Sequence, residues 1–112
     1  MVAVEAAWVG AMLEGEGSLG WYNNNAGRSK IPFLSIVNSE IETIATVLRL
    51  TGFGSVVLDR GKGAIDAATG HFGNKNIWSW RLRRSRDIIF LLEQVIPYLT
   101  GKQEKARQLL SD

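Results

Sequence analysis

Apolar residues recur along the chain with two different periods, and these predict helices and strands in turn. Spacings of three and four residues predict helices over residues 3–15, between Ser39 and Gly52, between Ser85 and Pro97, and from Thr100 to Ser111. Runs rich in β-branched and aromatic residues predict strands over 18–24, 30–37, 55–60 and 76–82. The turn-rich interval 23–27 is expected to close a hairpin, and 61–75 is expected to be a long loop.

Short polar motifs predict where the later helices begin. Ser39-x-x-Glu42 and Thr100-x-x-Gln103 have the spacing of capping boxes, and Ser85 is expected to cap the third helix. The apolar faces behind these caps are expected to comprise Ile41, Ile44, Ala45 and Leu48 in the second helix, and Ile88, Leu91, Leu92 and Val95 in the third.

The resulting element order, α-β-β-α-β-β-α-α over residues 1–112, predicts one α+β domain. We expect a four-stranded antiparallel sheet with all helices on one face, which leaves the other face free as a platform for nucleic acid. Trp78 and Trp80 share one side of the last strand and are expected in the core, so Ser79 and Arg81 are expected to point outward.

The first helix carries a stripe of small residues, Ala3, Ala7, Ala11 and Gly15, at every fourth position. Val2, Val9, Met12 and Leu13 are expected to fill the chain's own core instead. Small stripes let two helices approach backbone to backbone. We therefore expect this helix to pack against the same helix of a second copy, although packing of the alanines beneath the sheet is the simpler alternative.

The charge is uneven although the net charge is only +2. Segments 17–38 and 53–86 carry nine bases against two acids, whereas residues 1–16 carry three acids and no base. A basic surface with a separate acidic spot suggests a polyanion partner and a cation site. A charge run can also be an ordinary solvated face.

Several classes of protein are disfavoured by composition. The chain has no cysteine, which excludes disulfides and thiolate metal sites. It lacks an apolar run of the about 20 residues that a membrane span needs, and it shows no signal peptide. We expect an intracellular protein (cytoplasm or nucleoid, with an organelle as an alternative), without a membrane or small-molecule substrate.

Two acids, Glu14 and Glu16, end the first helix, where the helix dipole disfavours negative charge. In a two-fold dimer both copies of each acid would approach the axis, and bound divalent cations would relieve the repulsion. On the residues alone, two solvated glutamates without a metal are the favoured reading.

The segment Val9-Gly-Ala-Met-Leu-Glu-Gly-Glu-Gly-Ser18 resembles the LAGLIDADG motif of homing endonucleases. The resemblance continues through Pro32–Asn38, Gly52-Phe-Gly54, Trp78-Ser-Trp80-Arg81 and the tail Pro97-Tyr-Leu-Thr-Gly-Lys102, in the order that the family has them. The chain departs from the motif by having Glu at both acid positions and Gly10-Ala11 where the motif has Ala-Gly. The resemblance implies a single-motif, homodimeric enzyme whose sheets straddle DNA in the major groove. Many such enzymes are intron-encoded, but the sequence leaves open whether this reading frame lies in an intron or an intein or stands alone.

The resemblance also implies roles for particular residues. Glu16 matches the acid that binds the catalytic metal, and the backbone carbonyl of Gly15 matches a further ligand. Lys102 matches the basic residue near the scissile phosphate, and Asn38 falls where a polar residue helps to position water. Ala7, Ala11, Glu14 and Gly15 are expected in the dimer interface.

The implied reaction is hydrolysis of phosphodiesters by water activated by Mg²⁺ or another divalent cation such as Mn²⁺. Lone His71, in the loop, is expected to be an exposed residue or phosphate contact rather than a base. DNA contacts are expected from Ser18, Tyr22, Asn24, Arg28, Lys30, Ser35, Arg60, Lys62, Lys75 and Arg81, with loop bases on phosphates and strand side chains on base edges. Because two identical sheets would meet the DNA, the site is expected to be palindromic or nearly so.

Two other functions stay open at this point. The same fold could serve as a non-cleaving module that binds DNA or RNA, as in an intron-splicing maturase or a regulator. A generic α+β RNA-binding domain is the third alternative, but such a sheet normally exposes aromatic residues for base stacking. The presence of both Glu16 and Lys102 favours the nuclease, because a pure binder needs neither.

Overall fold

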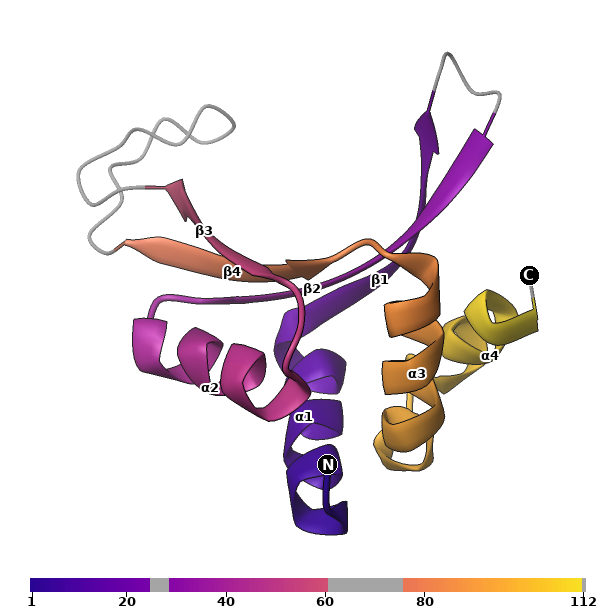
Figure 1. Cartoon of the computed structure of the whole chain (residues 1–112), viewed down its shortest axis with the longest axis horizontal. Helices are drawn as coiled ribbons and strands as arrows, with labels where there is room; N and C mark the ends of the chain where they lie inside the picture. Colours follow the sequence, from indigo (N-terminus) through magenta and orange to yellow (C-terminus); the bar gives the residue numbers. More distant parts are fainter. Residues whose placement is uncertain (25–28, 61–75, 112) are drawn as a thin grey trace.

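The computed structural model describes residues 1–24, 29–60 and 76–111, and its elements follow the expected order (Figure 1). The helices are α1 (Ala3–Glu16), α2 (Ile41–Thr51), α3 (Ser85–Val95) and α4 (Gln103–Ser111), with a short 3₁₀ helix, η1 (Ile96–Tyr98), before α4. The strands are β1 (Gly17–Asn24), β2 (Ser29–Asn38), β3 (Ser55–Arg60) and β4 (Ile77–Leu82). None of these helices is long and apolar enough to cross a membrane.

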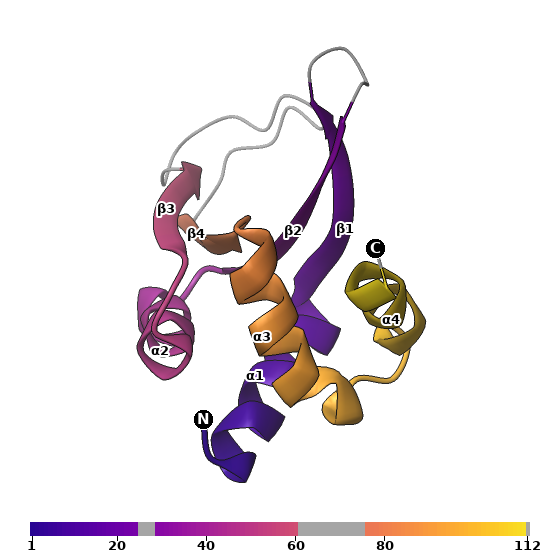
Figure 2. The same ribbon diagram turned by 45° about the vertical axis from the view of Figure 1, so that its right-hand side comes forward.

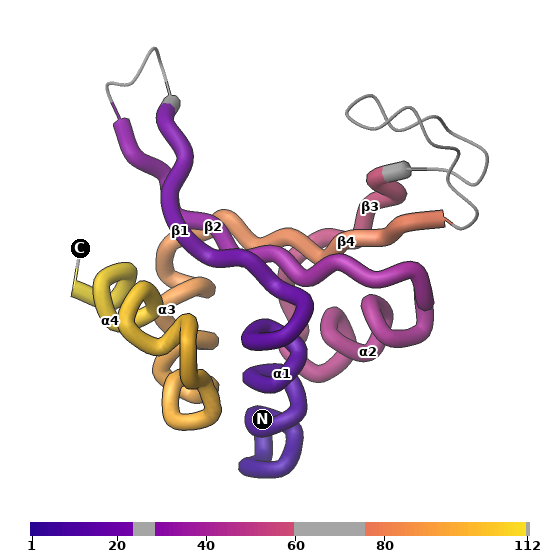
Figure 3. Tube along the Cα trace, turned by 180° about the vertical axis from the view of Figure 1, so that it is seen from behind, coloured from indigo at the N-terminus to yellow at the C-terminus, as the bar shows by residue number. Residues whose placement is uncertain are grey.

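The four strands form one antiparallel sheet in the order β1-β2-β4-β3. All helices lie against one face of the sheet, and the opposite face curves away from them (Figures 1 and 3). We call this uncovered surface the open face. The α+β class and the sheet with helices on one side, both expected from the sequence, are confirmed. The expected loop over 61–75 lies outside the described residues.

The core fills the space between the sheet and α1, α2 and α3, which lie below it in Figure 2. Its largest fully buried side chain is Trp80, whose indole Nε1 donates a hydrogen bond of 2.9 Å to the carbonyl of Phe53. Trp78 packs half-buried against the same core, so the prediction for both tryptophans is confirmed. Helix η1 approaches α1 closely at Gly10, where an added Cβ would lie 2.9 Å from Cβ of Tyr98.

The strand register assigns each side chain to a face. Leu34 and Ile36 of β2 are fully buried beneath the sheet, so Ser35 and Val37 belong to the open face. Ser18 of β1 pairs directly with Ser35, which places it on the same face. The open face thus carries the alternate residues of each strand, and the remaining strand residues lie on the helix side of the sheet.

The capping predictions are wrong, and a local hydrogen bond at α2 and a long-range one at α4 accompany two of the differences. Glu40, not Ser39, is the N-cap of α2, because the side-chain carbonyl of Asn38 accepts the N–H of Glu40 at 2.7 Å and shapes the turn before the helix. At α4 the Thr100 N–H, which a capping box would need, is donated to Glu14 instead at 2.7 Å. The Gln103 amide then donates to the carbonyl of Ile96 at 3.0 Å.

The third capping prediction fails because α3 begins one residue early. Arg84 is the N-cap, and its carbonyl accepts the N–H of Ile88 at 3.0 Å, so Ser85 is already helical. The predicted apolar face of α3 is nevertheless confirmed, since all four of its residues are buried. Gly52 does end α2, in the left-handed conformation with φ of 78° that glycine adopts without strain.

Two apolar faces differ from the prediction. In α2 the buried residues are Ile44 and Val47, whereas Ile41 and Ala45 are exposed, so their assignment to the apolar face is wrong. In α1, Val9 and Leu13 fill the core as expected, and Met12 packs partly against it. Val2 precedes the helix and is 62% exposed, so its assignment to the core is wrong.

Candidate active site and nucleic-acid interface

Glu16 is the last residue of α1, at the point where the chain enters β1. Its side chain is exposed, and its Oε2 accepts a hydrogen bond from the Nδ2 of Asn38, at the end of β2. The other side-chain atom of Asn38, Oδ1, is held by the N–H of Glu40. The fold thus joins two predicted site residues that are 22 positions apart in the sequence, and Asn38 fixes one oxygen of the Glu16 carboxylate.

Glu14 points toward a different part of the chain. Its Oε1 accepts the backbone N–H groups of Thr100 at 2.7 Å and of Lys102 at 3.1 Å, just before α4. These backbone hydrogen bonds, first that of Lys102, hold the pKa of the Glu14 carboxyl below its usual value. Glu14 therefore ties α1 to the turn before α4, a role that the sequence did not suggest.

Lys102 lies at the same junction. Its ammonium donates to the backbone carbonyl of Glu14 in the last turn of α1, where carbonyl groups carry partial negative charge. A hollow of about 250 Å³ opens beside it, lined by Gly17, Ser18, Leu19, Gly101, Lys102 and Lys105. Two lysines therefore border this hollow, which begins at Gly17, and Lys105 was not among the predicted site residues.

The small-residue stripe of α1 faces away from the chain's own core. Ala3, Ala11 and Gly15 are exposed and Ala7 is half-buried, and Val4 beside them is 75% exposed. We call the exposed residues Ala3, Val4, Ala11 and Gly15 the outer face of α1. The opposite side, with Ala6, Val9, Gly10 and Leu13, is buried. The helix is thus apolar on both sides but covered on only one.

The donor set at the end of α1 suits a hard divalent cation. It consists of the carboxylate of Glu16 and backbone carbonyls of the last helical turn, and Mg²⁺ prefers such oxygen ligands. Within the described residues, no three His, Asp or Glu side chains lie close enough to form a metal site by themselves. The described residues of one chain could therefore supply part of the ligand set of such a cation.

The structure brings only some of the expected DNA contacts together. Ser18, Tyr22, Ser35 and Arg81 all lie on the open face by strand register. Lys30 does not join them, because it alternates to the helix side and lines a hollow there with Trp21, Pro32 and Ile88. Arg28, Lys62, Lys75 and His71 lie outside the described residues, as do the side chains of Asn24 and Arg60.

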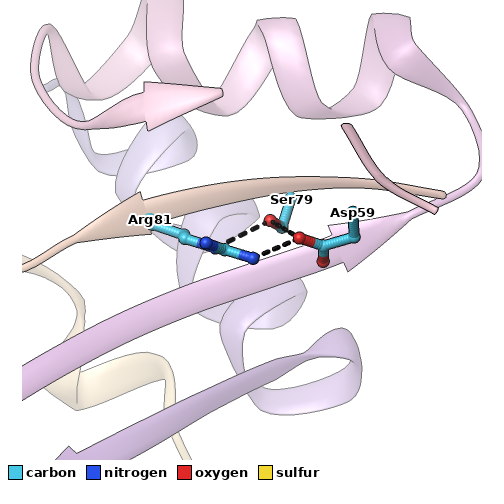
Figure 4. Close-up of polar contacts among 3 residues, drawn as sticks. All are labelled: Asp59, Ser79 and Arg81. Atoms are coloured by element: carbon cyan, nitrogen blue, oxygen red, sulfur yellow. Dashed lines mark hydrogen bonds and ion pairs between the residues drawn. The ribbon is translucent and has the colours of Figure 1, made fainter. Parts of the chain in front are cut away.

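A polar network occupies the open face between β3 and β4 (Figure 4). Arg81 forms an ion pair with Asp59, and its Nε donates to the hydroxyl of Ser79 at 3.1 Å. Ser79 in turn donates to Asp59 at 3.0 Å. Ser79 does point outward as expected, yet it is only 1% exposed, because its two partners cover it.

Arg83 is a second arginine of the open face, and it was not among the residues predicted to contact DNA. Its guanidinium lies 5.1 Å from the centre of the Tyr22 ring, a cation–π arrangement. Tyr22 also contacts Phe33, with 6.4 Å between the ring centres. The sequence could have predicted this position, because Arg83 lies two residues beyond Arg81 and alternation along the strand places both on the same side.

Arg81 and Arg83 border two hollows of the sheet surface. One of about 320 Å³ is lined by Tyr22, Phe33, Leu34, Ser35 and the two arginines. The other, of about 390 Å³, is lined by the two arginines with Gly54, Ser55, Val57, Leu82, Arg84 and Asp87. The open face is thus a basic, hollowed surface with aromatic side chains at one end.

Comparison with known proteins gives a result only at the level of structure. No family model and no curated protein matches the sequence. The homing endonuclease I-CvuI, solved in complex with its target, superposes with a TM-score of 0.72 over 97% of this chain and 65% of its own length, at 15% identity. The archaeal intron-encoded homing endonuclease I-Vdi141I, complexed with DNA, gives 0.72 over 96% of this chain and 65% of its own, at 13% identity.

A larger protein shows the same likeness. The LAGLIDADG meganuclease I-AabMI, bound to uncleaved DNA, gives a TM-score of 0.70 over 96% of this chain but only 35% of its own length, at 13% identity. The similarity therefore covers nearly all of this chain and at most about two thirds of these three structures. The chain has the fold of the LAGLIDADG homing endonucleases, as its motif from Val9 to Ser18 predicted.

Proposed function

We propose that the protein is a site-specific endonuclease of double-stranded DNA that acts as a homodimer. The observation that carries this proposal is the exposed Glu16 carboxylate, held by Asn38 at the end of a helix whose outer face is apolar and uncovered. The proposal draws support from the neighbours in fold, among which I-CvuI was solved with its target in the presence of Ca and I-Vdi141I with DNA.

The outer face of α1 supports a dimer. A helix that is apolar all round is normally covered all round, and here Ala3, Val4, Ala11 and Gly15 are exposed. Their small size allows the close approach of a second backbone. The same helix of another copy has a matching surface, as a two-fold interface requires. Such a pairing would bring two copies of Glu16 toward one axis and complete the partial cation site.

Glu16 and the backbone carbonyl of Gly15 would hold Mg²⁺, or a related cation such as Mn²⁺. The bound cation supplies polarisation of the phosphate and a lower pKa for the attacking water. The chain's own contribution is to place the oxygens that hold it. Asn38 restrains one carboxylate oxygen of Glu16 and leaves the other for a ligand.

Lys102 and the open face provide the remaining functions. The Lys102 ammonium lies at the same end of α1 and would stabilise negative charge that develops on the phosphate. Ser18, Tyr22, Ser35 and Arg81 on the open face would contact DNA. Since two identical sheets would meet the duplex, the expected target is palindromic or nearly palindromic.

The test is cleavage of a randomised double-stranded DNA library in the presence of Mg²⁺, followed by sequencing of the ends. We expect cutting at one family of symmetric sites, and loss of cutting with EDTA or in Glu16→Gln, which should still bind DNA. Glu93→Gln, which changes an exposed glutamate of α3, is the matched control and should cut normally.

Two results would count against the proposal. Sequence-specific binding without any cutting by the unmutated protein would favour a non-cleaving binder of the same fold. A solution mass showing one copy of the chain on each DNA duplex would remove the shared site at the helix ends, and with it the mechanism proposed for Glu16.

A further inference from the structure

Arg81 projects from the middle of the open face rather than from its rim. It belongs to β4, an interior strand, and its direct neighbours across the sheet are Ser35 of β2 and Ser55 of β3. Both neighbours are small, and hollows of about 320 and 390 Å³ adjoin Arg81 on the two sides. The guanidinium therefore has open space around it, and its side chain is 40% exposed.

The guanidinium is held along one edge only. Its Nε donates to Ser79 and its Nη2 donates to Asp59, so these partners occupy the edge formed by Nε and Nη2 (Figure 4). A guanidinium has five N–H donors in a rigid plane. The outer edge is formed by the two terminal nitrogens, Nη1 and Nη2. Nη2 uses one of its two N–H groups for Asp59, so each terminal nitrogen still has an N–H group that can donate along the outer edge.

The carboxylate of Asp59 indicates whether this edge would contact a phosphate or a base of DNA. Asp59 largely neutralises Arg81 and remains a quarter exposed, so it would repel a phosphate brought to the same place. A base edge carries no net charge and suffers no such repulsion. Two parallel N–H donors match the O6 and N7 acceptors of guanine in the major groove, the pairing that arginine makes most often with DNA.

We propose that Arg81 reads a guanine in each half of the DNA site, and that Asp59 and Ser79 are positioning residues that hold its guanidinium for this contact. The inference rests on the proposed function, because it requires double-stranded DNA on the open face. It adds the base, the atoms that recognise it, and two residues with no assigned part in DNA recognition.

Selection of binding sites from a randomised duplex library, without cleavage, tests the inference. The unmutated protein should select a guanine at one position in each half-site. Arg81→Lys keeps the charge but loses the paired donors, so the preference for guanine at that position should fall by about tenfold or more. Arg49→Lys, which makes the same change on α2 beneath the sheet, is the control and should leave the profile unchanged.

Asp59→Asn tests the positioning role. It should broaden base choice at the same position and leave the other positions as they are, whereas a purely structural role would leave every position unchanged. This variant also decides the question if thermal melting shows that Arg81→Lys fails to fold.

An unchanged profile in the folded variants, or a loss of affinity spread evenly over all sequences, would overturn the inference and leave the proposed function intact. An unmutated protein that selects no sequence at all would overturn the proposed function as well.

Discussion

Gly15 offers a test of the outer face of α1 that leaves the chain's own core undisturbed. Nothing in the single chain lies within 4 Å of a Cβ added at Gly15. At Gly10, five residues earlier on the covered side, an added Cβ would lie 2.9 Å from Tyr98 Cβ and 3.3 Å from the Val95 carbonyl. Gly15→Ala and Gly10→Ala therefore make the same chemical change on opposite sides of one helix.

The expected effects have opposite signs in the single chain. Alanine in place of a helical glycine stabilises by about 0.5–1 kcal/mol when it meets no obstacle, so Gly15→Ala should raise the melting temperature of the monomer by about 4 °C. Gly10→Ala meets Tyr98, and overpacking costs about 1–3 kcal/mol. That loss exceeds the gain in helix propensity, so this variant should melt earlier.

Gly15→Ala, which should stabilise the monomer, should weaken the dimer. If two copies of α1 pack through Gly15, each added Cβ meets a neighbouring backbone at a cost of about 1–3 kcal/mol, and each dimer contains two of them. A total of at least about 2 kcal/mol weakens dimerisation by about 30-fold. Gly15→Ala should therefore dissociate at concentrations where the unmutated protein is dimeric, and its cleavage activity should fall with the dimer.

Sedimentation equilibrium measures the strength of the dimer, and cleavage assays measure the activity. Thermal melts of dilute, monomeric protein measure the melting temperature of the single chain. The combination of a higher melting temperature, a weaker dimer and reduced cutting is expected only for a glycine that is free in the monomer and packed in the dimer. A Gly15→Ala protein that dimerises and cuts like the unmutated one would refute the argument that this face carries the interface.

The remaining predictions concern folding stability. Glu14→Gln should lower the free energy of unfolding at pH 7, because it removes the charge that the N–H groups of Thr100 and Lys102 stabilise. Since the pKa of Glu14 is depressed in the folded state, that stability is present above its usual pKa of 4.5 and is lost as the pH falls below it. Urea denaturation at pH 7 and at pH 3 checks this. Trp80→Phe should cost about 1–3 kcal/mol, because the buried hydrogen bond to Phe53 is lost. Denaturation beside the half-buried control Trp78→Phe measures it.

Each of the two stability predictions has a result that would contradict it. A difference between the Glu14 variant and the unmutated protein that stays constant from pH 7 to pH 3 would contradict the role of its charge. Equal losses for the two tryptophan variants would contradict the importance of the Trp80 hydrogen bond.

The sequence by itself determined the elements and the position of the acids. Periods of two and of three to four residues depend only on local backbone geometry, so the four strands and the face of α3 could be read directly. The stripe on α1 could be read for the same reason, although its spacing did not determine that Ala3, Ala11 and Gly15 are exposed. Glu16 had to lie at the end of α1, because the motif places it there.

Only the tertiary structure decided which polar groups meet. Glu14 takes the Thr100 N–H, and this long-range bond displaces the local capping box that Gln103 would complete. The pairing of β3 with β4 brings Asp59 to Arg81 across 22 residues, which buries Ser79 on a face that the alternation marks as exposed.

The features that the sequence predicted and the contacts that only the structure revealed differ for one physical reason. A periodic pattern records which side of an element faces apolar surroundings, and that information is held within a few neighbouring residues. A hydrogen bond between distant residues depends on strand register and on how helices dock, which no short window of sequence contains. The acid at the end of α1 was therefore predictable, whereas Asn38 as its partner in this chain and the Asp59–Arg81 pair required the assembled sheet.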